Sequence, residues 1–270
     1  MKIFFYIFIP VFLLSATSCT RDIGDAEKLN KKVTELFNAG MYAEAIPYAQ
    51  KDLAIRKKVL GPEHFDVTAA LDNLAALYRS LGKYEQAIPF YKRSLAIYKK
   101  ILGPGHPDVA RSMDNLAALY YVLGNYDNAE PLYKQSLNIR EKALGSEHPD
   151  VANSFNNLAA LYKDKADYAK AEPLYKQSSA IWEKTRGPEY PGIASSQKNL
   201  AMIYFAKGEY EKALVSYKRS LSIYEKVLGP EHPALVPDIK NLAKLYRKLG
   251  EDEKAEAMLK HSEKIKKKAQ

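Results

Sequence analysis

Apolar residues recur along most of the chain at three- and four-residue spacings, in pairs of segments that a glycine separates. In one pair they are Leu71, Leu74, Ala75, Leu77, Tyr78 and Leu81, followed by Tyr84, Ala87, Ile88, Tyr91, Leu95 and Tyr98. This spacing places the apolar residues on one face of an α-helix. Gly103 and Pro104 end the second segment, because glycine suits a helix C-cap and proline cannot continue a helix. The pattern therefore predicts a helical hairpin over residues 66–102.

The hairpin pattern repeats with a period of 42 residues. Asn-Leu-Ala recurs at this interval, beginning at Asn73, Asn115, Asn157, Asn199 and Asn241. A glycine after the second helix recurs at Gly61, Gly103, Gly145, Gly187 and Gly229. Because a fixed period of 20–50 residues is typical of stacked repeats, the sequence predicts a solenoid over residues 26–268. Its six predicted hairpins are 26–60, 66–102, 108–144, 150–186, 192–228 and 234–268.

The repeat resembles a known family. Leu74, Ala75, Tyr78, Ala87 and Tyr91 show the residue offsets of tetratricopeptide repeats. The 42-residue form, with Asn-Leu-Ala-x-Leu-Tyr, Tyr-x-x-Ala-x-Pro-x-Tyr and Leu-Gly-x-x-His-Pro, resembles the repeats of kinesin light chains and their bacterial relatives. The resemblance implies an all-α fold, a right-handed α-solenoid of stacked helix-turn-helix hairpins. It also implies a protein that binds another protein or a peptide.

Three departures from the regular repeat carry structural expectations. Residues 31–33 are Lys-Lys-Val in place of Asn-Leu-Ala, so residues 26–60 are expected to be a degenerate first repeat that caps the solenoid. Ala166 replaces the glycine between the two helices, at a cost of about 1 kcal/mol if that turn requires a left-handed residue. Prolines within the second helix are expected to bend it and not to break it, at Pro47, Pro89, Pro131 and Pro173.

The chain begins with a segment that resembles a bacterial lipoprotein signal. Lys2 precedes an apolar run over residues 3–14, then small residues and Cys19. Twelve apolar residues span only about 18 Å, too short for the roughly 30 Å of a bilayer's hydrocarbon core. The resemblance implies a signal peptide over residues 1–18, a lipid on Cys19, a short tether over residues 19–25, and an outer-membrane lipoprotein facing the periplasm.

The match to a lipoprotein signal is incomplete. Ala16 stands three residues before the cysteine, where leucine is typical, and Ser18 stands immediately before it, where glycine or alanine is typical. The alternative is a plain secretory signal with an incidental cysteine, which would leave the protein secreted or periplasmic.

The composition and the motifs do not support other functional classes. The formal net charge of +9 comes from interspersed Lys and Glu, and no basic block is interleaved with aromatic residues, so no nucleic-acid partner is expected. A single cysteine excludes an intramolecular disulfide and a cysteine-based metal site. No phosphate loop, nucleophile elbow or His-Glu-x-x-His segment occurs. We therefore expect no catalytic residues, no cofactor and no metal.

Residue types that recur once per repeat are expected to be structural. His64, His106, His148 and His232 lie a whole repeat apart and are predicted to be loop or cap residues. A tyrosine ladder is predicted to pack in the core, at Tyr78, Tyr120, Tyr162, Tyr204 and Tyr246. Serines are predicted where helices approach closely, at Ser94, Ser136, Ser178 and Ser220. The lysine-rich end, residues 260–270, is predicted to be a solvated capping helix, with contact to anionic lipid as the alternative.

The candidate site follows from the resemblance, which implies that the first helix of each hairpin lines a concave groove. The recurring asparagines Asn73, Asn115, Asn157, Asn199 and Asn241 occupy the groove positions, and each side chain offers a donor and an acceptor to a peptide main chain. The alternative is that some of them bridge adjacent hairpins. Neighbouring groove positions are acidic or neutral at Asp72, Asp114 and Asn156 and basic at Lys198, Lys240, Lys244, Arg247 and Lys248.

These features predict a non-enzymatic scaffold of the bacterial cell envelope that binds a partner protein or an extended peptide in its groove. The alternative is a periplasmic assembly factor or chaperone for an envelope or secretion machine.

Overall fold

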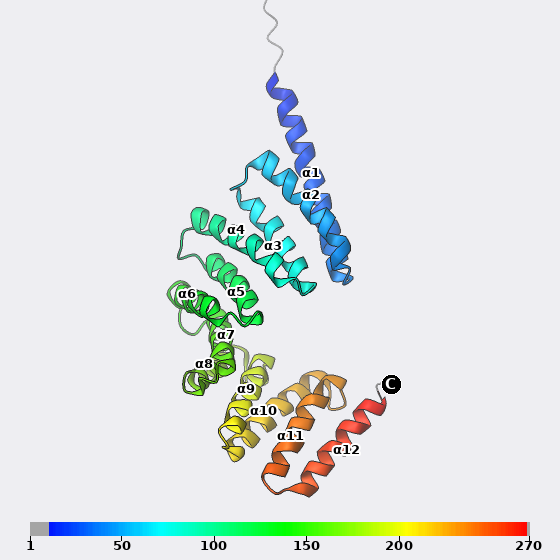
Figure 1. The fold of residues 1–270 in the computed structure, drawn as a ribbon, viewed down its shortest axis with the longest axis vertical. Helices are drawn as coiled ribbons and strands as arrows, with labels where there is room; N and C mark the ends of the chain where they lie inside the picture. The colour runs from blue at the N-terminus through cyan, green and yellow to red at the C-terminus, as the bar shows by residue number, and fades with distance from the viewer. Residues whose placement is uncertain (1–10, 269–270) are drawn as a thin grey trace, which may run out of the picture. The chain divides into compact units, whose positions relative to one another are not determined.

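A computed structural model describes the backbone of residues 11–268 and the side chains of residues 21–268 (Figure 1). The described residues form twelve α-helices and one short 3-10 helix, and no strand occurs among them. Most of the helices pair into stacked hairpins, which confirms the all-α repeat fold that the sequence predicts. Residues 1–10, which make up much of the expected signal peptide, lie outside the described residues.

The helix boundaries follow the predicted repeat closely. The helices are α1 (Val11–Asn38), α2 (Tyr42–Leu60), α3 (Phe65–Ser80), α4 (Tyr84–Leu102), α5 (Pro107–Val122), α6 (Tyr126–Leu144), α7 (Pro149–Asp164), α8 (Tyr168–Arg186), α9 (Pro191–Ala206), α10 (Tyr210–Leu228), η1 (Pro233–Leu235), α11 (Val236–Lys248) and α12 (Asp252–Lys268). Hairpins two to six each begin one residue before the predicted start and end at the predicted residue.

The chain divides into two compact units, residues 1–129 and 130–270, and each is described by itself. In the first unit, α1 pairs with α2 and α3 pairs with α4, and the hairpins meet where α2 packs on α3 and α4 packs on α5. In the second unit the pairs are α7 with α8, α9 with α10 and α11 with α12. Each first helix there packs on the second helix of the preceding hairpin, α9 on α8 and α11 on α10.

Helix α1 differs from the expected organisation of the N-terminal region. Residues 19–25, expected to be a short tether, are part of a helix that runs without a break from Val11 to Asn38. The chain has no proline between Pro10 and the turn at Gly40, so nothing in the backbone chemistry forces the helix to begin later. Among the described residues, no helix is long and apolar enough to span a bilayer.

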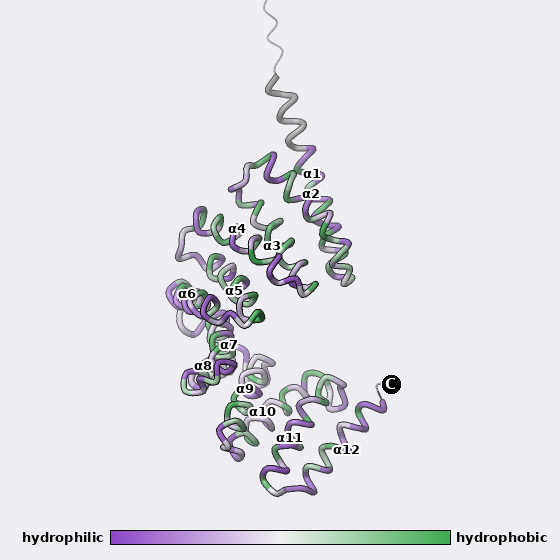
Figure 2. Tube along the Cα trace, viewed as in Figure 1, coloured by the Kyte–Doolittle hydropathy of each residue, from purple (hydrophilic) through white to green (hydrophobic). Residues whose placement is uncertain are grey.

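Each helix contains both apolar and polar residues (Figure 2), and the buried apolar residues form the core between the helices. Tyr162, Tyr204 and Tyr246 of the predicted tyrosine ladder are buried, whereas Tyr78 and Tyr120 are half-buried. The serines expected at close helix approaches are buried, at Ser94, Ser136, Ser178 and Ser220. Both recurring sets therefore serve packing, as predicted.

The turn within each hairpin has the same hydrogen-bonded form. In the second hairpin Gly82 has a φ of 72°, and the N–H of Lys83 donates to the carbonyl of Tyr78 at 2.9 Å. These are the features of a Schellman C-cap, which needs a left-handed residue. Ala166 adopts a φ of 58° at the equivalent position and is the one non-glycine residue with a positive φ in the part of the chain that the structure describes. The expected strain at Ala166 is therefore present.

The recurring histidines cap helices, as predicted. The imidazole Nδ1 atom of His64, His106 or His148 accepts a hydrogen bond from the backbone N–H two residues later, at 3.1 to 3.2 Å. His232 accepts the N–H of Ala234 in the same way at 3.2 Å. These contacts satisfy one of the unpaired N–H groups at each helix start.

Prolines lie inside the second helices, and each of these helices continues past its proline. The positions are Pro47 in α2, Pro89 in α4, Pro131 in α6 and Pro173 in α8, each the sixth residue of its helix. The prediction that these prolines do not break the helices is confirmed.

We predict that Ala166→Gly raises the free energy of unfolding by about 1 kcal/mol, because glycine adopts a positive φ without the clash that a Cβ atom creates. The reverse substitution at the equivalent turn, Gly208→Ala, is the matched control and should lower stability by a similar amount. Denaturant titration of both variants measures the effect. A loss of stability in Ala166→Gly would show that this turn is not strained.

Candidate functional site

Five recurring asparagines lie on the first helices of successive hairpins. Asn73 is on α3 and Asn115 on α5 in the first unit, whereas Asn157, Asn199 and Asn241 are on α7, α9 and α11 in the second. Each side chain is half-buried and precedes a buried leucine. The repeat therefore holds every asparagine beside the core with part of its side chain open to solvent.

Two of the five asparagines bridge adjacent hairpins, which is the alternative that the sequence left open. The amide of Asn73 donates to the side-chain oxygen of Asn30 on α1 at 2.7 Å. The side-chain oxygen of Asn199 accepts from the ammonium of Lys163 on α7 at 3.1 Å, and its amide donates to the carbonyl of Ser195 at 3.1 Å. These two residues contribute to hairpin stacking, so they have less to offer a ligand.

The other three asparagines keep their hydrogen-bonding groups available. Among the side chains that the structure describes, those of Asn115, Asn157 and Asn241 have no hydrogen-bond partner within the protein. A primary amide has two N–H donors and an acceptor oxygen, so each can pair with both groups of a peptide backbone. These three residues are the better candidates for main-chain recognition.

A small cavity lies beside Asn73 in the first unit. Its volume is about 170 Å³, and it is lined by Val33, Thr34, Phe37, Asn73 and Ala76. The first three belong to α1, which the sequence identified only as a degenerate repeat. Position 37 carries Phe where the next repeat has Arg79, and this departure was the available signal for an apolar lining.

The acidic positions of the first unit are engaged inside the fold. The carboxylate of Asp72 accepts a hydrogen bond from the Tyr98 hydroxyl of α4 at 3.4 Å. Burial raises the pKa of Asp72, although the nearby hydroxyls of Ser94 and Tyr98 and the charge of Arg111 oppose this effect. Asp114 also has an interaction partner. These acids contact protein groups, so the groove in this unit is less acidic than the sequence alone suggests.

Lys198 likewise has a partner within the protein. Its ammonium lies 2.5 Å from a carboxylate oxygen of Asp238, whose side chain is only 8% exposed. The pair joins α9 to α11 across two hairpins. Lys198 is therefore not among the free cations of the candidate surface.

The remaining predicted cations lie on α11. Lys244, Arg247 and Lys248 are exposed, and none of them forms an ion pair with the side chains that the structure describes. Lys240 is half-buried and lies beside Lys266 of α12, and this neighbouring ammonium lowers the pKa of Lys240. Helix α11 thus presents positive charge that the protein does not neutralise.

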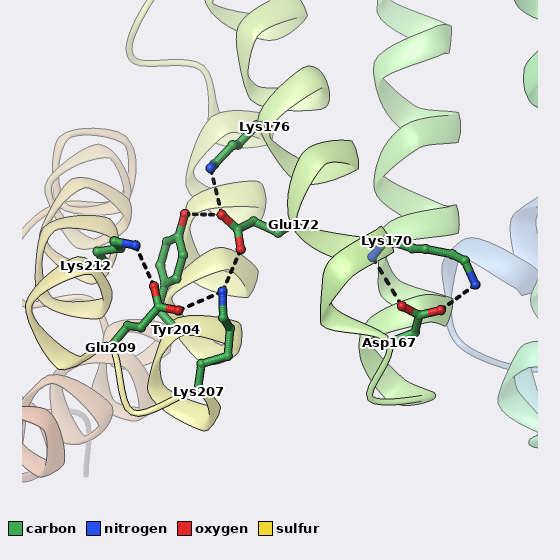
Figure 3. Close-up of polar contacts among 8 residues, drawn as sticks. All are labelled: Asp167, Lys170, Glu172, Lys176, Tyr204, Lys207, Glu209 and Lys212. Atoms are coloured by element: carbon green, nitrogen blue, oxygen red, sulfur yellow. Dashed lines mark hydrogen bonds and ion pairs between the residues drawn. The ribbon is translucent and has the colours of Figure 1, made fainter.

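Elsewhere in the second unit, opposite charges link one hairpin to the next. Glu172 of α8 accepts hydrogen bonds from the Tyr204 hydroxyl at 3.1 Å and from Lys207 at 3.0 Å, both on the hairpin that follows, and pairs with Lys176 at 2.7 Å (Figure 3). These hydrogen bonds lower the pKa of Glu172 to about 2, and the bond from Lys176 is the largest cause.

The preceding hairpin repeats this arrangement. Glu130 of α6 accepts from Tyr162 at 2.9 Å and from Lys165 at 3.1 Å, and pairs with Lys134 at 2.8 Å. The hydrogen bond from Lys134 is the main cause that lowers its pKa to about 2. Two such clusters show that the charged residues here stabilise stacking.

The described residues do not form a cluster of metal-ligating side chains. Among the described residues, no three His, Cys, Asp or Glu side chains lie close enough together to hold a metal ion.

Comparison with known proteins identifies the family. The model of the tetratricopeptide repeat matches residues 25–100, 66–142, 108–184, 150–226 and 192–268. The matches overlap and together cover the whole of the predicted solenoid, residues 26–268. The chain therefore belongs to the tetratricopeptide repeat family, whose members are generally non-enzymatic scaffolds that bind proteins or peptides.

Solved structures with the same fold include proteins of the kinesin-light-chain type. TPR-like repeats from Podosopora anserina, described as those of a kinesin light chain, are 31% identical with a TM-score of 0.66, covering 77% of this chain and 99% of theirs. BtubC (BKLC) from P. vanneervenii is 24% identical with a TM-score of 0.70, covering 93% and 92%. The apo form of RapI is 20% identical with a TM-score of 0.64, covering 92% and 85%. The comparison with curated protein sequences found no match.

We predict that Glu172→Gln lowers the free energy of unfolding at pH 7 by about 1–2 kcal/mol, because the ionised carboxylate holds Lys176, Tyr204 and Lys207. The pKa of Glu172 is lower in the folded protein than its unfolded value of 4.5, so the ionised carboxylate stabilises the fold at pH values above 4.5. This stabilisation is lost as the pH falls towards about 2. The difference between wild type and variant should therefore shrink over this range. Urea titrations at several pH values measure it.

The matched control is Glu256→Gln. Glu256 occupies the same repeat position 84 residues later, is exposed, and has no ion pair among the described side chains. This control should change stability by less than about 0.5 kcal/mol at every pH. Equal effects of the two substitutions would rule out a specific role for the Glu172 cluster.

Proposed function

We propose that the protein is a non-enzymatic scaffold that binds an extended segment of a partner protein along its first helices and is held at a bacterial envelope membrane by a lipid on Cys19. The observation that carries the binding proposal is the set of three half-buried asparagines with free amides, Asn115, Asn157 and Asn241. They occupy one repeat position, so the second unit offers the same contact at Asn157 and Asn241, and the first unit offers it at Asn115.

The asparagine contacts favour recognition of a peptide main chain and not of a particular sequence. An extended peptide exposes alternating N–H and C=O groups, and one amide side chain can pair with both. Each contact contributes about 0.5–1.5 kcal/mol, so the two in the second unit support a moderate affinity. Sequence preference must come from neighbouring positions.

Charge on α11 supplies one such preference. Lys244, Arg247 and Lys248 are exposed and unpaired among the described side chains, so they favour acidic residues or a free carboxylate in this part of the ligand. Hydrogen bonds to charged groups contribute about 1.5–3 kcal/mol when well formed and less in an open groove. The resulting affinity should depend on salt.

The proposed location rests on the N-terminal sequence. The lone cysteine, Cys19, follows an apolar run too short to span a bilayer, as in a lipoprotein signal. Thr20 follows it, and a residue other than Asp at this place favours the outer membrane. The proposed protein therefore faces the periplasm from the outer membrane.

A periplasmic assembly factor or chaperone is the second candidate. The cavity lined by Val33 and Phe37 favours it, because a pocket of about 170 Å³ beside Asn73 can accept an apolar side chain that a folded client would hide. A pull-down that returns one stoichiometric partner supports the scaffold, whereas many unfolded clients support the chaperone.

We expect Cys19→Ser to abolish lipid attachment and to move the protein from the membrane fraction to a soluble or unprocessed form. Metabolic labelling with a fatty acid and fractionation of cells measure both effects. Membrane association and gel mobility that do not change in the variant would contradict the proposed anchor. A plain secretory signal would instead give a cleaved, unlabelled and soluble wild-type protein.

We expect two groove variants to affect partner binding differently. Asn157→Ala with Asn241→Ala should weaken binding about ten-fold at all salt concentrations, because main-chain hydrogen bonds are lost. Lys244→Ala with Arg247→Ala should weaken it mainly at low salt and reduce its salt dependence. Calorimetric titration of a captured partner at two salt concentrations separates these effects.

The charge-matched control for this experiment is Lys57→Ala with Lys58→Ala on α2, where both lysines are exposed and unpaired among the described side chains. This control should leave binding unchanged. If it weakens binding and neither groove variant does, the first helices are not the binding surface.

A further inference from the structure

Successive hairpins of the second unit contact each other through polar pairs that differ from one interface to the next. Lys198 of α9 pairs with Asp238 of α11 at 2.5 Å. Glu172 of α8 accepts hydrogen bonds from Tyr204 of α9 and from Lys207, the residue that follows α9, at 3.1 and 3.0 Å. In both cases the earlier hairpin presents one charged group to the first helix that stacks on it.

The last hairpin carries both presenting groups and has no described helix against them. Lys240 of α11 stands 42 residues after Lys198, and Glu256 of α12 stands 84 residues after Glu172. Among the described elements, α11 packs on α10, α12 and η1, and α12 packs on α11 and η1. Neither Lys240 nor Glu256 has an ion-pair partner among the described side chains.

Lys266 makes this face of the last described hairpin more positive than the corresponding internal faces. It takes the repeat position of Trp182 and Tyr224, which both belong to a core cluster between hairpins. Lys266 interacts with Lys240, and its positive charge is the main cause that lowers the pKa of Lys240. Lys244 acts in the same direction, whereas Glu263 opposes them. One repeat earlier, the carboxylate of Asp238 lies beside Lys198. At the equivalent position of the last hairpin, the two ammonium groups of Lys240 and Lys266 have no such carboxylate between them among the described side chains.

We propose that this end face, defined by Lys240, Glu256 and Lys266, is a docking surface for an acidic α-helix of a partner protein. The helix takes the place that a further first helix would occupy and sets a carboxylate between Lys240 and Lys266. Charge complementarity and the internal Lys198–Asp238 pair both identify this chemistry.

The internal contacts also fix where the partner's other groups lie. Position 196 of α9 corresponds to Asp238 of α11, and Tyr204 and Lys207 follow it by eight and eleven residues. Eight residues of helix rise by about 12 Å. The docked helix therefore carries its acid near one end and a hydroxyl or basic residue about 12 Å further on, opposite Glu256.

A second copy of this chain does not fit the face. Head-to-tail stacking would bring the first hairpin of one copy onto the last hairpin of another, with Lys28 at the position of Asp238. Lys28 would then meet Lys240 and Lys266, and three like charges would oppose the contact. The face also lacks the large exposed apolar residues found elsewhere on the chain, so docking should be reversible and sensitive to salt.

A helical probe tests the proposal without a known partner. The probe is a stapled peptide that copies residues 191–207 with Ser196→Asp, so that it presents the acid together with Tyr204 and Lys207. The matched control peptide carries Ser196→Lys. Both are titrated at low salt into the isotope-labelled full chain, and amide shifts report affinity and location.

The acidic peptide should bind at least about ten-fold more tightly than the control and shift amides of α11 and α12. A chain with Lys240→Glu and Lys266→Glu should prefer the lysine peptide, and Lys240→Glu alone should weaken the acidic one. Circular dichroism confirms that each variant is folded, and the single variant serves if the double one is not.

Several results would overturn the proposal. They are equal affinity for the two peptides, no binding of the acidic peptide, no reversal of preference in the charge-swapped chain, or shifts confined to α7 and α9. Self-association of the chain with crosslinks between Lys28 and Lys240 would identify a second copy as the occupant instead. The α2 variant Lys57→Ala with Lys58→Ala should leave peptide binding within about three-fold, which separates docking at this face from general attraction to exposed lysines.

Discussion

Burial of small and branched apolar residues between consecutive hairpins is the contact on which the fold depends. One core cluster joins Val151 and Ala152 of α7, Ile193 and Ala194 of α9 and Ile223 of α10, and four of these five residues are fully buried. A single hairpin cannot bury such a face alone, so it is stable only when the next hairpin covers it. A terminal hairpin must therefore be polar on its outer side or covered by another protein.

The period of the sequence was enough to predict the helices, turns and caps, because each depends on residues close together in the chain. The hairpin boundaries needed only the apolar spacing and the glycines. The strain at Ala166 followed from the five glycines at equivalent positions, and the capping role of His148 followed from its place before a helix. Local chemistry determines these features, so comparison of the repeats in the sequence is enough to predict them.

Contacts between repeats could not be predicted in the same way. Trp182 packs against Tyr190 with the rings tilted by 36° and their centroids 4.6 Å apart, and a Cβ on Gly192 would lie 2.8 Å from the Trp182 indole nitrogen. Glycine thus replaces the usual Asp so that the indole fits. Lys198 and Asp238 likewise both depart from their repeat positions and meet at 2.5 Å. Pairs of residues that both differ from the repeat pattern were the available signal, but only the structure shows which of these residues are in contact.

Binding specificity therefore depends on the residues that differ from the repeat pattern. Residues that follow the period, such as the buried alanines, are needed by every hairpin, so they cannot distinguish one partner from another. At the position of Glu172 the first unit has Ile46 and Ile88 and the second unit also has Leu214, so a charged residue replaces the apolar one in some repeats and not in others. Charges that stack hairpins inside the array remain capable of recognition where the array is uncovered. The same pairing chemistry can therefore serve both cohesion and binding, with coverage by a neighbour deciding which.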